Sequence, residues 1–242
     1  VFLMTRIGAA LVAAPIFGAF GVPAQVRVVL AGAIAVLVAA WTDVAVPADL
    51  FSLAGMLAVA GEVLLGLTLG FALQIAFAAP VIAAEVIGGA MGLSLAMVSD
   101  PNGGATTTAF GQYFTLVLTL IFLALGGHLE WLALVVESYR LFPPGETWLG
   151  PDRADMVAAF AGQTFAFALL IALPVTLVLL LVQAVTGILS RSAPALNLFA
   201  LGLPAGVLAG LGAMIVFAPV LYAQLEEVAG AGVANAAAVL AR

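Results

Sequence analysis

The segment SDPNGGATTT, residues 99–108, is a polar, glycine-rich break between two apolar runs, residues 91–98 and 110–125. Its proline cannot donate a backbone hydrogen bond, and its paired glycines add backbone freedom. In lipid, irregular backbone is tolerated only where protein buries it or water lines it. Two interpretations stay open: an ordinary turn outside the membrane, or a mobile element that faces a pore.

The composition indicates a bilayer or a membrane-embedded complex as the surroundings of this chain. Of its 242 residues, 65% are hydrophobic and 7% are charged, and the mean hydropathy is +1.30. A soluble domain of this length does not need so much apolar surface. The net charge of −6 includes no basic patch, so no nucleic-acid partner is expected. With no cysteine and a single histidine, we expect neither a metal site nor another cofactor.

The apolar runs predict an all-α, multi-helix integral membrane-type protein with broken helices, helical hairpins and about six apolar spans. The runs are residues 1–18, 28–41, 50–79, 81–98, 109–125, 156–189 and 196–221, and the tail to Arg242 is expected to be helical. Pro80 and Pro174 are expected to interrupt their runs, and broken spans need protein partners that satisfy the freed backbone groups. We therefore expect one subunit of a larger assembly. The chain begins at Val1 without an initiator methionine, so further residues are expected before it.

Residues 128–142 form an amphipathic segment, because His128, Glu130, Glu137 and Arg140 interrupt its apolar residues. Such a helix is expected to lie at an interface or to pack on a neighbour. The polar link that follows, residues 143–155, is the clearest boundary in the chain. It divides one continuous membrane-embedded unit into parts 1–150 and 151–242.

Two acidic residues, Glu62 and Glu85, lie inside apolar runs. A carboxylate at the bilayer centre costs about 2.5–3.5 kcal/mol on insertion scales, so it faces a partner or water. A proton relay and a buried hydrogen-bonding anchor between helices are both open. The anchor is favoured, because neither span carries a second acid or a basic partner at helical spacing.

Catalytic chemistry finds no support in the sequence. None of the serines lies in a G-x-S-x-G context, and no P-loop or dinucleotide fingerprint is present. One histidine at the start of a segment is more often an interface residue than a catalytic base. The chain is not expected to be an enzyme.

Five blocks of residues occur in order over nearly the whole chain. They are APIFG (14–18) with VPAQVR (22–27); GEVLLG (61–66) with GF (70–71); EVIG (85–88) with MGLS (91–94) and DP (100–101); GHL (127–129) with ESYRLFPPG (137–145); and GILSR (187–191) with PALNLF (194–199) and GLP (202–204). Each block is modest alone, and the ordered set is specific. In these blocks the chain resembles the flagellar export-gate protein family FliR and its type III secretion equivalents.

The chain departs from the family pattern at three positions. Phe20 stands where the family often has a basic residue, Ala90 where it often has glutamine, and Gly206 where lysine is common. The polar contacts that the family makes at these positions are therefore not expected here, and the three residues suit an unusually apolar packing.

The resemblance implies a structural and conducting role in a helical, pore-forming assembly. A FliR-like subunit joins several copies of FliP and FliQ, its N-terminal part (1–150) resembling FliP and its C-terminal part (151–242) resembling FliQ. FlhB and FlhA are further implied partners, with membrane lipid around the assembly and unfolded export substrates passing through it. The implied location is the bacterial inner membrane, in the export apparatus of the flagellar basal body.

The resemblance also implies a plug loop inside the channel. The implied plug residues are Met91, Leu95, Met97, Val98, Asp100, Pro101, Gly103 and Gly104. Large apolar side chains seal a pore against ions by excluding water, and flexible methionine packs around irregular cargo.

Two other functions remain as alternatives. The equivalent gate subunit of a virulence injectisome would share the family, and neighbouring genes would distinguish the two machines. A secondary transporter would need matched helix breaks in two halves and a polar midplane site. Pro80 and Pro174 do not lie in matching contexts, which counts against a transporter.

Overall fold

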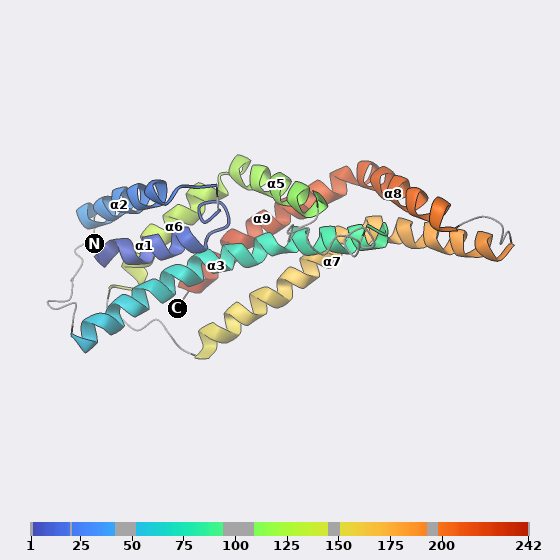
Figure 1. Cartoon of the computed structure of the whole chain (residues 1–242). Helices are drawn as coiled ribbons and strands as arrows, with labels where there is room; N and C mark the ends of the chain where they lie inside the picture. The colour runs from blue at the N-terminus through green and yellow to red at the C-terminus, as the bar shows by residue number, and fades with distance from the viewer. Residues whose placement is uncertain are drawn as a thin grey trace. The chain divides into compact units, whose positions relative to one another are not determined.

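The computed structural model describes residues 2–19, 21–41, 52–93, 109–144, 151–192 and 198–241, with backbone alone for 151–154 and 198–201. All regular secondary structure in those ranges is helical (Figure 1), which confirms the predicted all-α class. The helices are α1 (Phe2–Ala13), α2 (Ala24–Trp41), α3 (Leu53–Ala90), α5 (Ala109–Ala124), α6 (Gly127–Leu141), α7 (Pro151–Ser192), α8 (Leu198–Val216) and α9 (Ala218–Leu240).

Three described helices, α2, α3 and α7, are each long and apolar enough to cross a membrane. Two bent pairs, α5 with α6 and α8 with α9, pass the same test only as pairs, which brings the count to at most five in the described ranges. The sequence predicted about six spans. The count falls because the runs 50–79 and 81–98 share the single helix α3, and because the run 1–18 contains only the 12-residue helix α1.

Pro80 and Pro174 lie inside α3 and α7 and do not end them, so the predicted interruptions at both prolines are wrong. A proline within a helix removes one backbone hydrogen bond and costs about 3 kcal/mol. Neighbouring helices can compensate for that loss in a membrane-type protein. Pro80 is itself buried, which places the freed backbone against protein.

The ends of two helices differ from the predicted links. Helix α7 begins at Pro151, within the segment predicted as a link to Asp155, because proline suits the first turn, where its missing N–H needs no partner. The predicted run 196–221 is divided at Phe217, where α8 and α9 meet at 70°. The tail is helical to Leu240, as predicted.

The chain forms two compact units. Unit 1 comprises Val1–Phe77, Phe122–Gln163 and Ala229–Arg242, and unit 2 comprises Ala78–Ile121 and Thr164–Val228. The predicted division at residues 150/151 concerns likeness to other subunits and stays a prediction.

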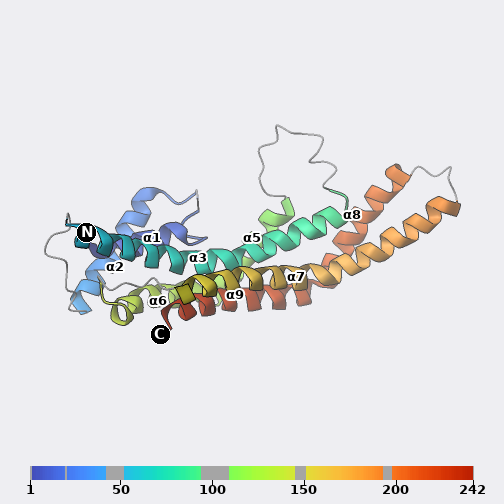
Figure 2. The same ribbon diagram turned by 90° about the horizontal axis from the view of Figure 1, so that it is seen from below.

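Unit 1 is built around the first part of α3. Helix α1 packs on α2, and α2 contacts α6; Figures 1 and 2 both show these three helices gathered beside α3. Gly66 and Gly70 of α3 face α1 so closely that a Cβ at residue 70 would lie 2.5 Å from the Ala10 carbonyl oxygen. Gly232 of α9 meets α3 in the same way, since its Cβ would lie 2.9 Å from Leu73. Glycine at these positions lets the helix backbones approach.

Unit 2 contains the second part of α3 together with α8 and parts of α5, α7 and α9. Its α3 segment ends in a cap in which the Leu93 N–H donates to Gly88 O and the Gly92 N–H to Gly89 O, both at 3.0 Å. Gly92 has a φ of 86°, a left-handed conformation that favours glycine. This is a Schellman motif, and it satisfies two carbonyls that the helix end would otherwise leave without partners.

Candidate functional site

A buried ion pair joins three helices of unit 1. The Arg6 side chain of α1 and the Glu62 side chain of α3 are 1% and 3% exposed. Arg6 Nε donates to Glu62 Oε2 and Arg6 Nη2 to Glu62 Oε1, both at 2.8 Å. This two-pronged geometry suits the planar guanidinium, and a lysine could not reproduce it.

The remaining donors of Arg6 bind the C-terminal end of α6. Arg6 Nη1 donates to Ser138 O at 2.8 Å and to Ser138 Oγ at 3.1 Å, and Nη2 donates to Phe142 O at 2.9 Å. Ser138 O also accepts the Phe142 N–H at 2.9 Å, and the last carbonyls of a helix carry partial negative charge that favours a cation. The guanidinium therefore uses all five of its N–H groups, which is the condition under which a buried charge is tolerated.

Tyr139 covers the same guanidinium. Its ring centroid lies 4.2 Å from Arg6 Cζ, a cation–π contact, and its hydroxyl donates to Leu3 O at 2.6 Å. The predicted amphipathic helix thus packs on neighbours inside the protein, with Trp131, Val135 and Tyr139 buried. Of the two possibilities left open for this helix, packing is the one observed.

Trp131 is a second connection between α6 and α3. It is fully buried, its indole Nε1 donates to Leu69 O at 3.1 Å, and its ring stacks on Phe17 with centroids 5.8 Å apart. Replacing Trp131 with phenylalanine removes the donor and leaves a void. We expect the free energy of unfolding to fall by about 1–3 kcal/mol, which lowers the thermal midpoint of the purified protein.

Trp41 provides the matched control for that substitution, because its side chain is 67% exposed. Trp41→Phe should change stability by less than about 0.5 kcal/mol. Equal effects of the two substitutions would show that the bond from Trp131 to Leu69 contributes nothing.

The two acidic residues singled out in the sequence have different surroundings. Glu62 lies buried between helices, and its basic partner Arg6 comes from another helix, so spacing within one span could not reveal it. Glu85 is exposed on the part of α3 that belongs to unit 2. The predicted buried position of Glu85 is therefore not what the structure shows.

Met91 directly follows α3 and is 2% exposed. Its side chain lies against Gly210 of α8, where an added Cβ would meet Met91 Sδ at 3.0 Å and Cγ at 2.8 Å. Gly206 faces the backbone of the same residue, its Cβ position being 3.1 Å from Met91 O. Gln183 of α7 donates from Nε2 to Ala90 O at 2.8 Å.

Two of the three departures from the family pattern, Ala90 and Gly206, lie at this joint. The small residue at 206 allows α8 to approach the end of α3, which is the apolar packing that these departures predicted. The other implied plug residues lie outside the described residues; they are Leu95, Met97, Val98, Asp100, Pro101, Gly103 and Gly104.

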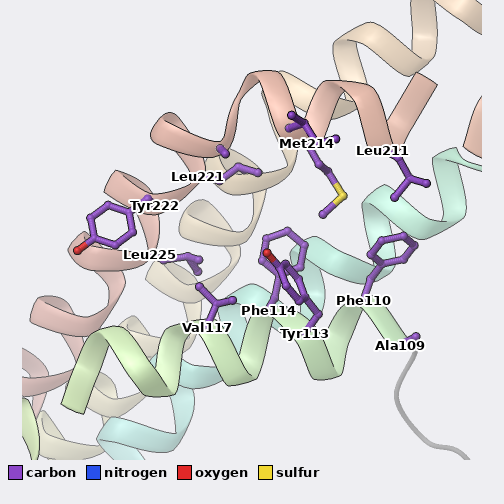
Figure 3. Close-up of a pocket in the computed structure, with 12 residues that line it drawn as sticks. Ala109, Phe110, Tyr113, Phe114, Val117, Leu211, Met214, Leu221, Tyr222 and Leu225 are labelled. Carbon is purple, nitrogen blue, oxygen red and sulfur yellow. The ribbon is translucent and has the colours of Figure 1, made fainter. Parts of the chain in front are cut away.

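A cavity of about 750 Å³ lies within unit 2, between α5 and the junction of α8 and α9 (Figure 3). Aromatic and aliphatic side chains line it, among them Phe110, Phe114, Met214 and Leu225, and no charged residue does. Tyr113 and Tyr222 add their hydroxyls and are 54% and 52% exposed. The lining has no acid, base or nucleophile arranged for catalysis, and no described residues form a group of three potential metal ligands.

Large apolar side chains also remain exposed on the helices. On α7 within unit 2, Phe165 is 64% exposed, Leu181 68% and Ile188 68%. Unpartnered apolar faces of this size mark contact with lipid or with other proteins.

The profile of the family described as "Bacterial export proteins, family 1" matches residues 1–231. The chain belongs to this family. Among its relatives are the flagellar biosynthetic proteins FliR of Pectobacterium carotovorum subsp. carotovorum, 31% identical over 89% of this chain and 82% of the relative, and of Escherichia coli (strain K12), 30% identical over 93% and 85%. The FliR of Aquifex aeolicus (strain VF5) is 30% identical over 88% of this chain and 82% of the relative. The predicted resemblance to FliR is confirmed.

Reasoning from the sequence did not identify Arg6 and Gln183 as contact residues. Arg6 lies within the first apolar run. An arginine in such a run indicates that an acidic group or a carbonyl must face it. Gln183 stands alone among apolar residues, and nothing in its spacing points to Ala90.

Proposed function

We propose that this chain is the gate subunit of the flagellar type III export apparatus. It forms with FliP and FliQ the channel through which unfolded flagellar proteins cross the bacterial inner membrane, and it contributes the plug of the closed pore. FlhB and FlhA are its further partners, and lipid surrounds the assembly. The family match over residues 1–231 carries this proposal.

The described structure supports an assembled state. The apolar faces of α2 and α7 have few partners among the described residues, since only 17% and 33% of their spanning windows are buried. Proline-containing helices and the broken junction at Phe217 add backbone groups that a protein neighbour can satisfy. These features suit a subunit that is completed by other chains.

Co-expression with FliP and FliQ of the same organism tests the proposal. The complex is purified in detergent and its mass determined under native conditions. One large complex with a single copy of this chain is the expected result. A monodisperse particle of this chain alone, with the others left behind, would favour the transporter alternative and a search for substrate binding near Glu85.

The plug assignment has its own test. Deleting Gly103 and Gly104 shortens the implied plug, so we expect potassium to leak from vesicles that contain the assembled mutant complex. Gly103→Ala with Gly104→Ala keeps the length and serves as control, with a smaller leak. An intact complex that stays as tight as the wild type after the deletion would argue against the plug.

The flagellar machine is favoured over the injectisome because the relatives named above are flagellar proteins. Loss of swimming without loss of effector injection, after deletion of the gene, is the expected phenotype. The reverse would identify the injectisome.

A further inference from the structure

The end of α3 is fastened to two other helices of unit 2. The Schellman cap at Gly92 satisfies the carbonyls of Gly88 and Gly89, and Gln183 of α7 binds the carbonyl of Ala90. Met91, between these groups, is inserted against α8. Consecutive residues at this end are therefore held by a cap, a side-chain hydrogen bond and a packed side chain.

Two glycines of α8, Gly206 and Gly210, form the surface on which Met91 packs, called the Met91 seat below. Gly206 and Gly210 are one helical turn apart, so they lie on one face of α8. A Cβ added at residue 206 would touch the backbone of Met91, and one added at residue 210 would touch its side chain. Gly202 and Gly212 of the same helix have nothing within 4 Å of an added Cβ, so close approach is confined to the Met91 seat.

The seat is apolar and is not filled on every side. A cavity of about 290 Å³ adjoins it, lined by Gly89, Thr186 and Leu203 among others. Among the described contacts, the packing of Met91 and the Gln183 bond tie the α3 end to α8 and α7 beside that space. Loss of the Met91 contact should allow the end of α3 to adopt other positions.

We infer that Met91 is a positioning residue, which sets where the chain leaves α3 by tying this helix end to Gly206 and Gly210 of α8. This inference rests on the proposed function, because the implied plug begins within a few residues of Met91. Its side chain is packed inside unit 2, so it acts by holding the helix end and not by sealing a channel.

A disulfide can replace the methionine contact. Because the chain contains no cysteine, two introduced cysteines have no other partner within it. The Cβ position at residue 210 lies 2.8 Å from Met91 Cγ, which brings the two Cβ positions into disulfide range. The test uses the assembled complex with Met91→Cys and Gly210→Cys, in vesicles of phosphatidylethanolamine and phosphatidylglycerol. Disulfide formation is measured as loss of maleimide labelling, and leak as potassium efflux.

We expect the reduced double mutant to leak about tenfold faster than the wild type, because two unlinked cysteine side chains no longer hold the end of α3 against α8 as the packed methionine does. Oxidation should return efflux to the wild-type rate although methionine is still missing. A channel seal made by the Met91 side chain would not be restored by oxidation. Failure of the disulfide to form in the assembled complex, or equal leak in both redox states, would overturn the inference.

A second pair of variants uses bulk in place of a cross-link. Gly206→Val pushes on the backbone of Met91, which cannot swing aside, and should raise efflux about tenfold in an assembled complex. Gly212→Val, in open space on the same helix, is the matched control and should stay tight. If Gly206→Val prevents assembly, Met91→Ala replaces it, with Met91→Leu as the variant that restores a tight pore.

The two proposals fail in different ways. If the Gly103 and Gly104 deletion leaks while the oxidised and reduced cysteine pair behave alike, the plug stands and the role of Met91 is wrong. If neither the deletion nor the seat variants leak in assembled complexes, the plug and the inference both fall.

Discussion

Arg6→Ala is expected to lower the free energy of unfolding by about 3–5 kcal/mol, because it leaves the Glu62 carboxylate buried without its ionic partner. The same substitution removes the donors that bind Ser138 and Phe142 at the end of α6. Three helices of unit 1 would lose their common contact. The measurement is the thermal midpoint of the purified complex, followed by the fluorescence of its tryptophans.

The exposed pair Arg140–Glu137 is the control for the buried one. Its atoms are 3.3 Å apart, and the side chains are 56% and 46% exposed. Arg140→Ala should therefore cost no more than about 1 kcal/mol. Similar shifts for Arg6→Ala and Arg140→Ala would contradict the importance of the buried pair.

Three further variants separate the effect of charge from that of geometry. Arg6→Lys keeps the charge but lacks the planar fork, so it should recover only part of the loss. Arg6→Met combined with Glu62→Leu removes both charges and should be much more stable than Arg6→Ala alone. Exchanging the two residues should not rescue, because the carbonyls of Ser138 and Phe142 would then face a carboxylate.

Alanine at both Gly66 and Gly70 should also reduce stability strongly, by about 1–3 kcal/mol at each site. At residue 70 the new Cβ would lie 2.5 Å from Ala10 O and 2.6 Å from Ala13 Cβ, and at residue 66 it would collide with Arg6 O. Backbone atoms cannot rotate away, so α1 must move off α3 and carry Arg6 with it. The thermal midpoint and the yield of assembled complex report the loss.

Alanine at Gly61 should change the free energy of unfolding in the opposite direction. Gly61 is in the same helix, but an added Cβ there meets nothing within 4 Å. Gly61→Ala should stabilise by about 0.5–1 kcal/mol, because alanine loses less backbone entropy in a helix. Destabilisation at both places would mean that close approach of α1 is not the cause.

The class of the protein and the position of most helices followed from hydropathy, because a long apolar run has few alternatives to a helix in an apolar medium. Pro80 and Pro174 show where that reasoning fails. A proline removes one hydrogen bond, and whether the helix survives depends on what packs beside it, which the local sequence does not contain. The broken junction at Phe217 was missed although Pro219 stands in the first turn of α9, a position where proline is common at a helix start.

The glycine pairs illustrate the same limit at the level of contacts. Four G-x-x-x-G pairs occur in the chain, at 66/70, 88/92, 202/206 and 206/210. Close approach to another helix involves both glycines at 66/70 and at 206/210, whereas Gly88 and Gly202 face open space. A spacing of four places two glycines on one face, but only the path of the neighbouring helix decides whether that face is used.

The sequence by itself determined a helical, membrane-type export subunit, since its apolar runs and ordered motif blocks extend over nearly the whole chain. It also showed that Glu62 needed a partner, because an isolated carboxylate in apolar surroundings is costly. Only the tertiary structure identified that partner as Arg6, 56 residues away, and separated the exposed Glu85 from the buried Glu62. The physical reason is that burial and pairing are properties of the packed helices, and sequence spacing constrains them only within a single helix.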